Sequence, residues 1–312
     1  MERSSREAYG KTLVELGRQD PNIVVLDADL SKSTMTMFFA REFPDRFFDC
    51  GVAEQNMIGV AAGLAASGKT AFASTFAVFA PGRCFDQIRM SVSQPCLNVK
   101  IVATHGGITV GEDGTSHHAI EDIALATSLV GLKVVVPADA VEASQAVKVA
   151  ARTPGPFYVR LGRPKVAVVH SDDYEFVLGK AVTMRPGGDA TVIANGLMVA
   201  VALQAADSLS QGGVDCRVLN MSTVKPLDRE AIARAAAETG AIVTVEEHQR
   251  TGGLGSAVAQ VVAEECPVTM AFMGIDDIHS KSGKPQELLE KSGLTAAGIE
   301  KAVQSLLKRK RR

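Results

Sequence analysis

Short runs of β-branched and other apolar residues alternate along the chain with longer segments whose apolar residues recur at helical spacing. This alternation is typical of parallel sheets whose strands are joined by helices. Ser4 and Glu7 have the spacing of a capping box and predict the start of the first helix. In the first half, the predicted strands are Ile23–Leu26, Thr70–Ser74, Val99–Thr104, Lys133–Val136 and Phe157–Leu161, with helices over 54–66 and 139–151.

A stretch rich in proline, glycine and charge, 162–188, interrupts the alternation, and we interpret it as the connection between two domains. Beyond it the pattern resumes with strands near 190–195, 216–221, 241–247 and 268–273 and with helical segments between them. The sequence therefore predicts an α/β fold in two parts. We place a first domain at 1–168, a linker at 169–188 and a smaller second α/β domain at 189–312.

Charge and composition exclude several classes of protein. The chain has 33 basic and 35 acidic side chains, a formal net charge of −2, so it lacks the positive field that gathers nucleic acid. No apolar run approaches the ~20 residues of a membrane span, and the N-terminus lacks the pattern of a secretory signal. The five cysteines are scattered, which favours neither a disulfide framework nor a zinc site. We expect a cytoplasmic protein that binds neither nucleic acid nor membrane, with a frayed, solvated basic end at 308–312.

Glu54 begins a predicted helix that carries almost no other charge. A carboxylate at a helix N-terminus complements the helix dipole, which is a purely structural explanation. The rest of this helix looks buried on every side, however, and a buried acid is costly unless it is paired or used. The residues alone leave both interpretations open. Gly59 and Gly63 on the same helix would let another backbone approach closely, which suits packing at a subunit interface.

A loop with several histidines and glycines, residues 104–122, follows directly after a predicted strand; we call it the His-Gly loop. It holds His105, Asp113 and His117, and it is too polar and flexible for a core. Strand ends of this kind are where open α/β sheets bind ligands. The acids and histidines lack a familiar metal-ligand spacing, so a loop that lines a polar substrate is favoured. Phe76 and Phe79, three residues apart, predict by themselves only core packing.

Three motifs, GVAEQNM at 51–57, STFAVF at 74–79 and the His-Gly loop, resemble in order and spacing the pyrimidine-binding domain of transketolases. The segment EEHQRTGGLGSAV at 246–258 resembles the C-terminal domain of the same family. The resemblance covers essentially the whole chain. It implies a thiamine-diphosphate-enzyme pyrimidine-binding domain, with a parallel sheet flanked by helices, followed by a smaller α/β transketolase C-terminal domain.

One family motif is missing from this sequence. Thiamine diphosphate enzymes hold the diphosphate and its Mg²⁺ with a GDG motif and a later asparagine, and no GDG occurs here. Because the chain begins with Met1 just before the first helix, the resemblance implies the C-terminal half of a split transketolase rather than a truncation. Its partner would be an N-terminal subunit that carries GDG and holds Mg²⁺. We expect an α2β2 heterotetramer in which this subunit also pairs with itself.

The resemblance also implies roles for residues near the cofactor. Glu54 would contact N1′ of the thiamine diphosphate pyrimidine, with Phe76 and Phe79 forming its aromatic pocket and Asp29 beside it. Transketolases usually have a further aromatic residue where this chain has Gly82, so the pocket would be more open.

The implied reaction transfers a two-carbon ketol unit from a ketose phosphate to an aldose phosphate. Glu54 and His117 would be the catalytic residues. Arginine side chains suit phosphate oxygens because they form short, charge-assisted hydrogen bonds. The positions matching the family's substrate ligands are Arg6, Ser33, His105 and Arg160 for phosphate and Asp113 and His117 for sugar hydroxyls. Arg163 is an alternative phosphate ligand, and without the resemblance Arg160 would be interpreted as a structural pairing.

Three other functions remain open. Deoxyxylulose-phosphate synthase shares AEQ and a similar loop, but usually has an aspartate and an arginine where this chain has Thr104 and His105. The beta subunit of a 2-oxo acid dehydrogenase has half length and the same fold but lacks the EDGTSHH pattern. A non-catalytic α/β binding subunit would require neither the acid at 54 nor the histidines. The glycine turn at 251–256 is assigned no chemistry.

Overall fold

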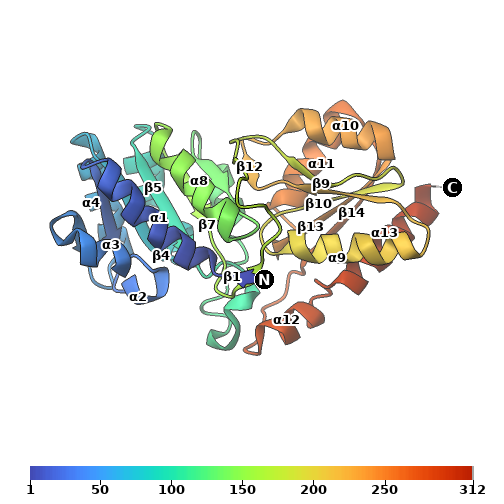
Figure 1. Ribbon diagram of the computed structural model, residues 1–312, viewed down its shortest axis with the longest axis horizontal. Coiled ribbons are helices and arrows are strands. Elements are labelled where there is room, and N and C mark those ends of the chain that lie inside the picture. The colour runs from blue at the N-terminus through green and yellow to red at the C-terminus, as the bar shows by residue number, and fades with distance from the viewer. Residues whose placement is uncertain (311–312) are drawn as a thin grey trace.

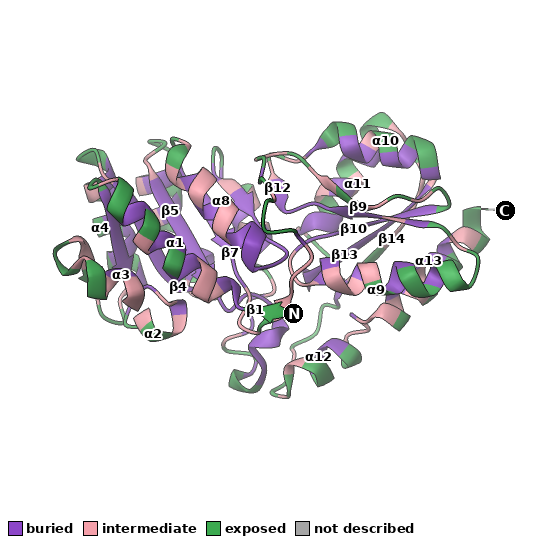
Figure 2. Cartoon of the chain, in the orientation of Figure 1, coloured by how far each residue is buried: buried purple, intermediate pink, exposed green. Residues whose placement is uncertain are grey.

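A computed structural model describes residues 1–310, and these form two α/β domains side by side (Figure 1). The N-terminus lies where the domains meet, and the chain ends at the far side of the second domain. In both domains the central strands of the sheet are buried, while the longer helices turn a buried face inward and an exposed face to solvent (Figure 2). The predicted fold class, parallel sheets flanked by helices in two successive domains, is confirmed.

The first sheet has the strand order β12-β6-β7-β5-β4-β2-β3. Its neighbouring strands are parallel apart from β12, which is antiparallel to β6. The predicted strands of this domain are therefore confirmed to within two residues at each end. The strands are β2 (Ile23–Asp27), β3 (Phe47–Asp49), β4 (Thr70–Phe76), β5 (Val99–Thr104), β6 (Lys133–Val135), β7 (Phe157–Arg160) and β12 (Thr223–Lys225), and a separate ribbon pairs β1 (Glu2–Arg3) with β8 (Val166–Ala167).

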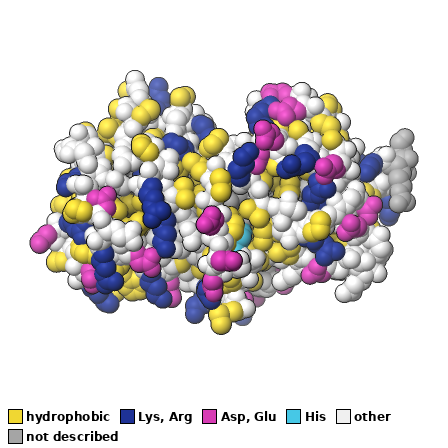
Figure 3. All heavy atoms as spheres, turned by 45° about the horizontal axis from the view of Figure 1, so that its top comes forward, with side chains coloured by type: hydrophobic (Ala, Val, Ile, Leu, Met, Phe, Trp, Pro, Cys, Tyr) yellow, Lys and Arg dark blue, Asp and Glu magenta, His cyan; other side chains and the backbone are white. Residues whose placement is uncertain are grey.

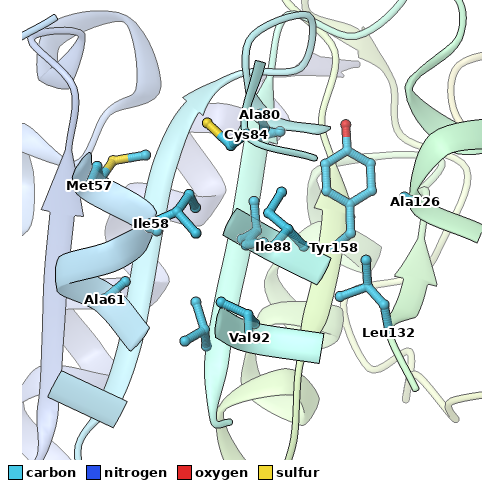
Figure 4. Packing of buried hydrophobic residues seen from close by; sticks show 14 of the residues in the cluster. Met57, Ile58, Ala61, Ala80, Cys84, Ile88, Val92, Ala126, Leu132 and Tyr158 are labelled. Atoms are coloured by element: carbon cyan, nitrogen blue, oxygen red, sulfur yellow. The ribbon is translucent and has the colours of Figure 1, made fainter. Parts of the chain in front are cut away.

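Helices cover both faces of this sheet. The helix α1 (Ser5–Gln19) begins as predicted, because the Ser4 side chain accepts a hydrogen bond from the amide of Glu7. It packs with α8 (Ala140–Arg152) and α3 (Met37–Glu42) on one face. On the other face, α4 (Glu54–Ala66) and its neighbours bury Met57, Ile58 and Ala61 (Figure 4). The remaining helical segments are α2 (Ser31–Thr34), η1 (Pro44–Arg46), α5 (Ala80–Arg83), α6 (Phe85–Gln87), η2 (Ile88–Ser93), η3 (Ile108–Asp113) and α7 (Asp122–Ser128).

The second sheet has the order β14-β13-β10-β11-β9, and β9 is its antiparallel edge strand. Helices α9, α12 and α13 pack on one face, and α10 and α11 pack on the other. The elements are β9 (Val182–Arg185), β10 (Ala190–Ala194), α9 (Met198–Gln211), β11 (Cys216–Asn220), α10 (Arg229–Thr239), β13 (Ala241–Gln249), α11 (Leu254–Glu265), β14 (Thr269–Ile275), α12 (Pro285–Lys291) and α13 (Ala296–Lys310).

The connection between the domains is more structured than the sequence predicted. Strand β9 lies inside the expected linker, 169–188, yet it belongs to the second sheet. Strand β12 comes from the second half of the chain but completes the first sheet. Both are short edge strands, and a few alternating residues among prolines and charges give no strand pattern in a sequence. The start of the linker is also fixed, since the amides of Val169 and His170 donate to the buried carboxylate of Asp139.

The basic end of the chain is helical as far as the structure describes it. Lys308 to Lys310 form the last turn of α13, and the Lys310 ammonium donates to the carbonyl oxygen of Thr239 at 2.5 Å. A frayed end is therefore wrong for these residues, and 311–312 lie outside the described residues. No helix within 1–310 is long and apolar enough to cross a membrane. Basic and acidic side chains are interspersed over the face shown in Figure 3, in line with the near-zero net charge.

Candidate active site

The candidate residues gather along one edge of the first sheet. Phe76 is the last residue of β4, His105 follows β5, and Asp29 follows β2. Because these strands are parallel, their carboxyl ends meet at the same edge. This is the edge at which open α/β sheets bind ligands.

Glu54 is the first residue of α4, and its side chain is only 3% exposed. Its carboxylate accepts a hydrogen bond from Nη1 of Arg83 at 2.7 Å. Arg83, itself 47% exposed, also places its guanidinium 4.5 Å from the centre of the Phe79 ring. The buried acid is therefore paired, and the partner is a residue that no sequence signal had identified.

One side of α4 faces away from the protein. Gly59, Val60 and Gly63 are exposed, whereas Met57 and Ile58 on the opposite side are buried. A Cβ added at Gly59 or Gly63 would meet no atom of residues 1–310 within 4 Å. The prediction that this helix is buried on every side is wrong for the chain by itself. Its apolar composition reflects one packed side and one flat, small-residue side that is open.

Phe76 and Phe79 form a stacked pair, with ring centres 5.9 Å apart and planes 14° from parallel. Phe76 also stacks on the ring of His105 at 3.8 Å, and Phe79 meets the edge of His117 at 5.5 Å. The two rings therefore connect the Glu54 side of the site to the His-Gly loop. A Cβ at Gly82 would meet nothing within 4 Å among the described residues, so no other part of the described chain covers this position.

Two arginines meet beside the His-Gly loop. Arg6 donates to the carbonyl oxygens of Ser33 at 2.5 Å and of Arg163 at 2.9 Å. Arg163 donates to the carbonyl oxygen of Val110 and lies 4.0 Å from the carboxylate of Asp113. These contacts use three of the five N–H donors of Arg6, counting its Nε bond to Arg163 at 3.2 Å, so two remain for a ligand.

His105 lies buried next to these arginines, and its Nδ1 is 2.8 Å from the hydroxyl of Thr104. Burial, followed by the charges of Arg6 and Arg163, lowers the pKa of His105 to about 3. The ring is therefore neutral at neutral pH and acts as a hydrogen-bonding group rather than a cation. The structure thus brings Arg6, Ser33, Asp113 and His105 together, as the sequence predicted, and adds Arg163.

Arg160 is not part of this cluster. Its side chain is 5% exposed, its Nε bonds Asp122 at 2.8 Å, and its Nη2 donates to the carbonyl oxygens of Ala119 and Glu247. Arg160 lies within strand β7 and points between the domains, whereas Arg163 lies past the end of that strand. The geometry thus supports the structural pairing of Arg160 and does not support its assignment as a phosphate ligand.

The segment after β2 is shaped by a buried acid, Asp27. Its carboxylate accepts hydrogen bonds from the amide of Leu30 and from the hydroxyls of Thr34 and Thr36, at 2.6, 2.7 and 2.9 Å. Burial raises the pKa of Asp27 to about 6 despite these bonds. They fold the segment that carries Ser33 and Asp29, and Asp29 itself has a left-handed φ of 61°.

The adjacent histidines of the His-Gly loop have different surroundings. His117 is half-buried beside the aromatic pair, and its Nδ1 is 2.9 Å from the hydroxyl of Ser116. His118 is buried and contacts the carbonyl oxygen of Gly111 and the hydroxyl of Ser280 from the second domain. Only His117 of the two faces the aromatic pair. Within residues 1–310, no group of three or more His, Cys, Asp or Glu side chains could hold a metal ion.

A buried acid and a pair of stacked aromatic rings, linked through Arg83, thus lie at the carboxyl edge of a parallel sheet. Residues 1–168 match the family model of the transketolase pyrimidine binding domain, and residues 179–299 match the transketolase C-terminal domain. The chain belongs to the transketolase family.

Relatives of similar length support this assignment. A protein of Methanocaldococcus jannaschii described as a transketolase C-terminal section is 46% identical over 307 residues, which are 97% of this chain and 96% of that protein. The 6-deoxy-6-sulfo-D-fructose transketolase subunit SqwH of a Clostridium species is 43% identical, over 98% of this chain and 95% of that protein. A solved split gene transketolase, described as an inactive beta4 tetramer, is 53% identical with a TM-score of 0.93, covering 98% of this chain and 99% of that one.

Proposed function

We propose that this chain is the half of a two-subunit transketolase that binds the pyrimidine end of thiamine diphosphate. With its partner it transfers a two-carbon ketol unit from a ketose phosphate to an aldose phosphate. One observation carries the proposal: a continuous line of contacts runs from the acid to the anion-binding residues. Glu54 pairs with Arg83, Arg83 covers Phe79, and Phe79 stacks on Phe76, which stacks on His105 beside the two arginines.

The residues present fit the pyrimidine end of the cofactor. Flat aromatic faces hold a flat heterocycle by stacking, which Phe76 and Phe79 can provide. Glu54 is the buried carboxylate that would share a proton with N1′, and Asp29 lies on the same edge. When bound, thiamine diphosphate supplies the carbanion chemistry that breaks and forms the carbon–carbon bond, while the protein supplies geometry and proton control.

Arg83 must leave Glu54 before the Glu54 carboxylate can share a proton with N1′ of the pyrimidine. In the chain alone the Glu54 carboxylate is neutralised by Arg83 across 2.7 Å. Arg83 is half-exposed, so its guanidinium can return to solvent, but the Glu54 carboxylate that it leaves is 3% exposed and costly to leave unpaired. The pyrimidine would therefore have to replace Arg83 as the partner of Glu54. Release of Arg83 would leave Glu54 buried and facing the aromatic pair, which is where a base for the pyrimidine is needed.

The substrate would lie between the aromatic pair and the arginine cluster. Arg6 and Arg163, with Ser33 and neutral His105, suit a terminal phosphate, because guanidinium groups form charge-assisted hydrogen bonds to its oxygens. Arg163 takes the role that the sequence gave to Arg160. Asp113 and His117 would bind sugar hydroxyls, and His117 would also assist proton transfer, since its ring lies against Phe79. A terminal sulfonate, as in the sugar named for one relative, would suit the same arginines.

The diphosphate end and Mg²⁺ are assigned to a partner, an N-terminal transketolase subunit with the GDG motif. This is supported by relatives of nearly the same length, one of them named as a subunit and another described as an inactive beta4 tetramer. The open side of α4, next to Glu54, offers a flat surface for subunit packing. We propose an α2β2 heterotetramer in which each active site is completed by the partner.

Reconstitution tests this function. This chain, the GDG-bearing partner and their mixture would each be assayed with thiamine diphosphate, Mg²⁺, hydroxypyruvate and ribose 5-phosphate. Ketol transfer by the mixture alone is expected, and robust turnover by this chain alone would overturn the split-subunit proposal. Pyruvate with glyceraldehyde 3-phosphate, and pyruvate with a dehydrogenase acceptor, test the two related enzymes. A sugar with a terminal sulfonate tests which anion the arginines select.

A further inference from the structure

The His-Gly loop is held by the second domain as well as by the first. Glu247, buried in β13, accepts a hydrogen bond from the amide of Thr109 at 2.6 Å. Gly107 has a left-handed φ of 84°, and a Cβ there would overlap the Glu247 carboxylate. The loop backbone therefore lies directly against this carboxylate, in a place where a side chain at 107 would not fit.

The two ends of the loop are fixed at the same point. The amide of Gly107 donates to the carbonyl oxygen of Ala119 at 2.9 Å, which closes the loop on itself. Nη2 of Arg160 then joins Ala119 to the carbonyl oxygen of Glu247, at 2.9 and 3.0 Å. The amide of Gln249 donates to the carbonyl oxygen of Ile120 at 2.8 Å. Strand β13 thus carries the base of the loop, and α12 packs beside η3 farther along it (Figure 1).

Glu246, the preceding residue, forms the hydrogen bonds of its carboxylate within the second domain. Its carboxylate accepts the amides of Leu254 and Gly255 at the start of α11, at 2.7 and 2.8 Å. A Cβ at Gly253 would overlap this carboxylate, which explains why the turn is rich in glycine. Glu247 differs because its carboxylate reaches the first domain. A buried acid is costly unless it is paired, so its position requires an explanation at the loop.

We propose that Glu247 is a positioning residue for substrate binding, which sets the conformation of the His-Gly loop by accepting the Thr109 amide. The second domain then contributes to sugar binding indirectly. Its Glu247 holds the loop, and the loop carries His105, Asp113 and His117, which would contact the substrate. This role rests on the transketolase function proposed above.

A rival explanation is that Glu247 serves only as a counter-ion for Arg160. Asp122 already pairs with Arg160 at 2.8 Å, which favours the positioning role. Two substitutions separate the explanations. Glu247→Asp keeps the charge but shortens the side chain and withdraws it from Thr109. Glu247→Gln removes the charge but keeps an oxygen that can accept the Thr109 amide. Positioning predicts that aspartate loosens the loop and glutamine holds it, whereas a counter-ion role predicts the reverse.

Amide hydrogen exchange on the full chain measures the loop directly. In Glu247→Asp we expect exchange at Thr109 about 10- to 100-fold faster than in the wild type, since a charge-assisted hydrogen bond is lost. Glu247→Gln should remain near the wild type. The matched control, Glu246→Asp, should speed exchange at Leu254 and Gly255 and leave the loop unchanged. Unchanged exchange at Thr109 in Glu247→Asp, or equal loosening by glutamine, would overturn the proposal.

Kinetics of the assembled enzyme provide the second measurement. Glu247→Asp should raise KM for the phosphorylated acceptor more than for glycolaldehyde, because glycolaldehyde lacks the phosphate that His105 of the loop would contact. Equal losses on both acceptors would contradict a positioning role. Exchange at Thr109 does not depend on activity, so a wild-type enzyme without ketol transfer would reject the proposed function and leave the exchange result standing.

Discussion

Glu54 is the residue whose chemistry the proposed function needs most. In the assembled enzyme, Glu54→Gln should slow turnover by ~10²–10⁴, the usual worth of a positioned acid–base group, because an amide cannot share the pyrimidine proton. The change should leave the fold intact, since glutamine puts a neutral group of the same shape in the buried position and the released Arg83 is half-exposed. Turnover would be measured with thiamine diphosphate at saturation.

Arg83→Gln is the matched control for that experiment. It breaks the same ion pair but leaves the carboxylate of Glu54 in place, so turnover should stay within a few-fold of the wild type. A large loss in Arg83→Gln, or near-normal turnover in Glu54→Gln, would make Glu54 a helix-end carboxylate without a catalytic role.

Arg163 and Arg160 should behave differently despite lying three residues apart. Arg163→Gln should lower kcat/KM for a phosphorylated acceptor by ~10–150-fold, since a charge-assisted hydrogen bond is worth ~1.5–3 kcal/mol. Its activity with glycolaldehyde should stay near the wild type. The measurement is a comparison of the two acceptors in the assembled enzyme, and equal losses on both would remove Arg163 from the phosphate site.

Arg160→Gln should act on stability instead. Asp122 is 2% exposed and would keep the hydrogen bond from the Tyr158 hydroxyl but lose its cationic partner. Breaking a buried pair in this way costs ~3–5 kcal/mol in the free energy of unfolding. Urea unfolding would show this loss, whereas an acceptor-specific kinetic defect without loss of stability would return Arg160 to the substrate site.

At the scale of elements, the exposed side of α4 leads to a prediction about assembly. A Cβ at Gly59 would meet no described atom within 4 Å, and leucine is favoured over glycine in a helix interior by ~1 kcal/mol, so Gly59→Leu is the test. The isolated chain should therefore become slightly more stable, while subunit assembly weakens because the flat surface is lost. Thermal unfolding and sedimentation would measure the two effects. Gly188→Leu, an exposed position outside the helices, is the control for added bulk.

The sequence predicted elements well where the apolar pattern was long. The helix expected over 54–66 is observed as Glu54–Ala66, and the strand expected at 99–104 is Val99–Thr104. Strands β9 and β12 were missed, because three or four residues at a sheet edge carry little pattern.

Contacts between distant residues could not be predicted from the sequence. The strand-end position of the His-Gly loop was predicted, since a strand must end before it. Which of Arg160 and Arg163 is free to bind phosphate could not be predicted, because it depends on where β7 ends and on the pairing of Arg160 with Asp122. Arg83 gave no signal. Glu246 and Glu247 do give a signal, as adjacent acids at the end of an apolar strand pattern, AIVTVEEH, but the pattern does not indicate which of the two reaches the first domain.

At the scale of the whole molecule, the acids between the domains predict how stability depends on pH. Burial raises the pKa of Glu247 to about 7, against the opposing effects of Arg160 and of the Thr109 amide. The folded state then binds the Glu247 proton more tightly than the unfolded state. Protonated Glu247 therefore adds to the free energy of unfolding at low pH. This contribution is lost as pH rises from about 4.5 to about 7, by at most ~1.4 kcal/mol per pH unit.

Comparison with Glu247→Gln isolates this effect from the shifted pKa values of Glu246 and His248 nearby. The free energy of unfolding would be measured in urea from pH 5 to pH 8. The wild type should lose stability relative to the glutamine variant as pH rises through this window, and the difference should then level off. A difference that is constant with pH would show that the pKa of Glu247 is not raised in the folded protein.

Strand β12 prevents the first domain from being complete by itself, because this strand comes from the second half of the chain. The first sheet ends in β6, whose backbone is paired with Thr223–Lys225 from the other half of the chain. A fragment cut at residue 168 would leave that edge open, and open edges recruit strands from other molecules. We expect such a fragment to aggregate, and light scattering would show it. Recombination that exchanged the first domain between family members at this boundary would therefore also have to carry the three residues that close its sheet.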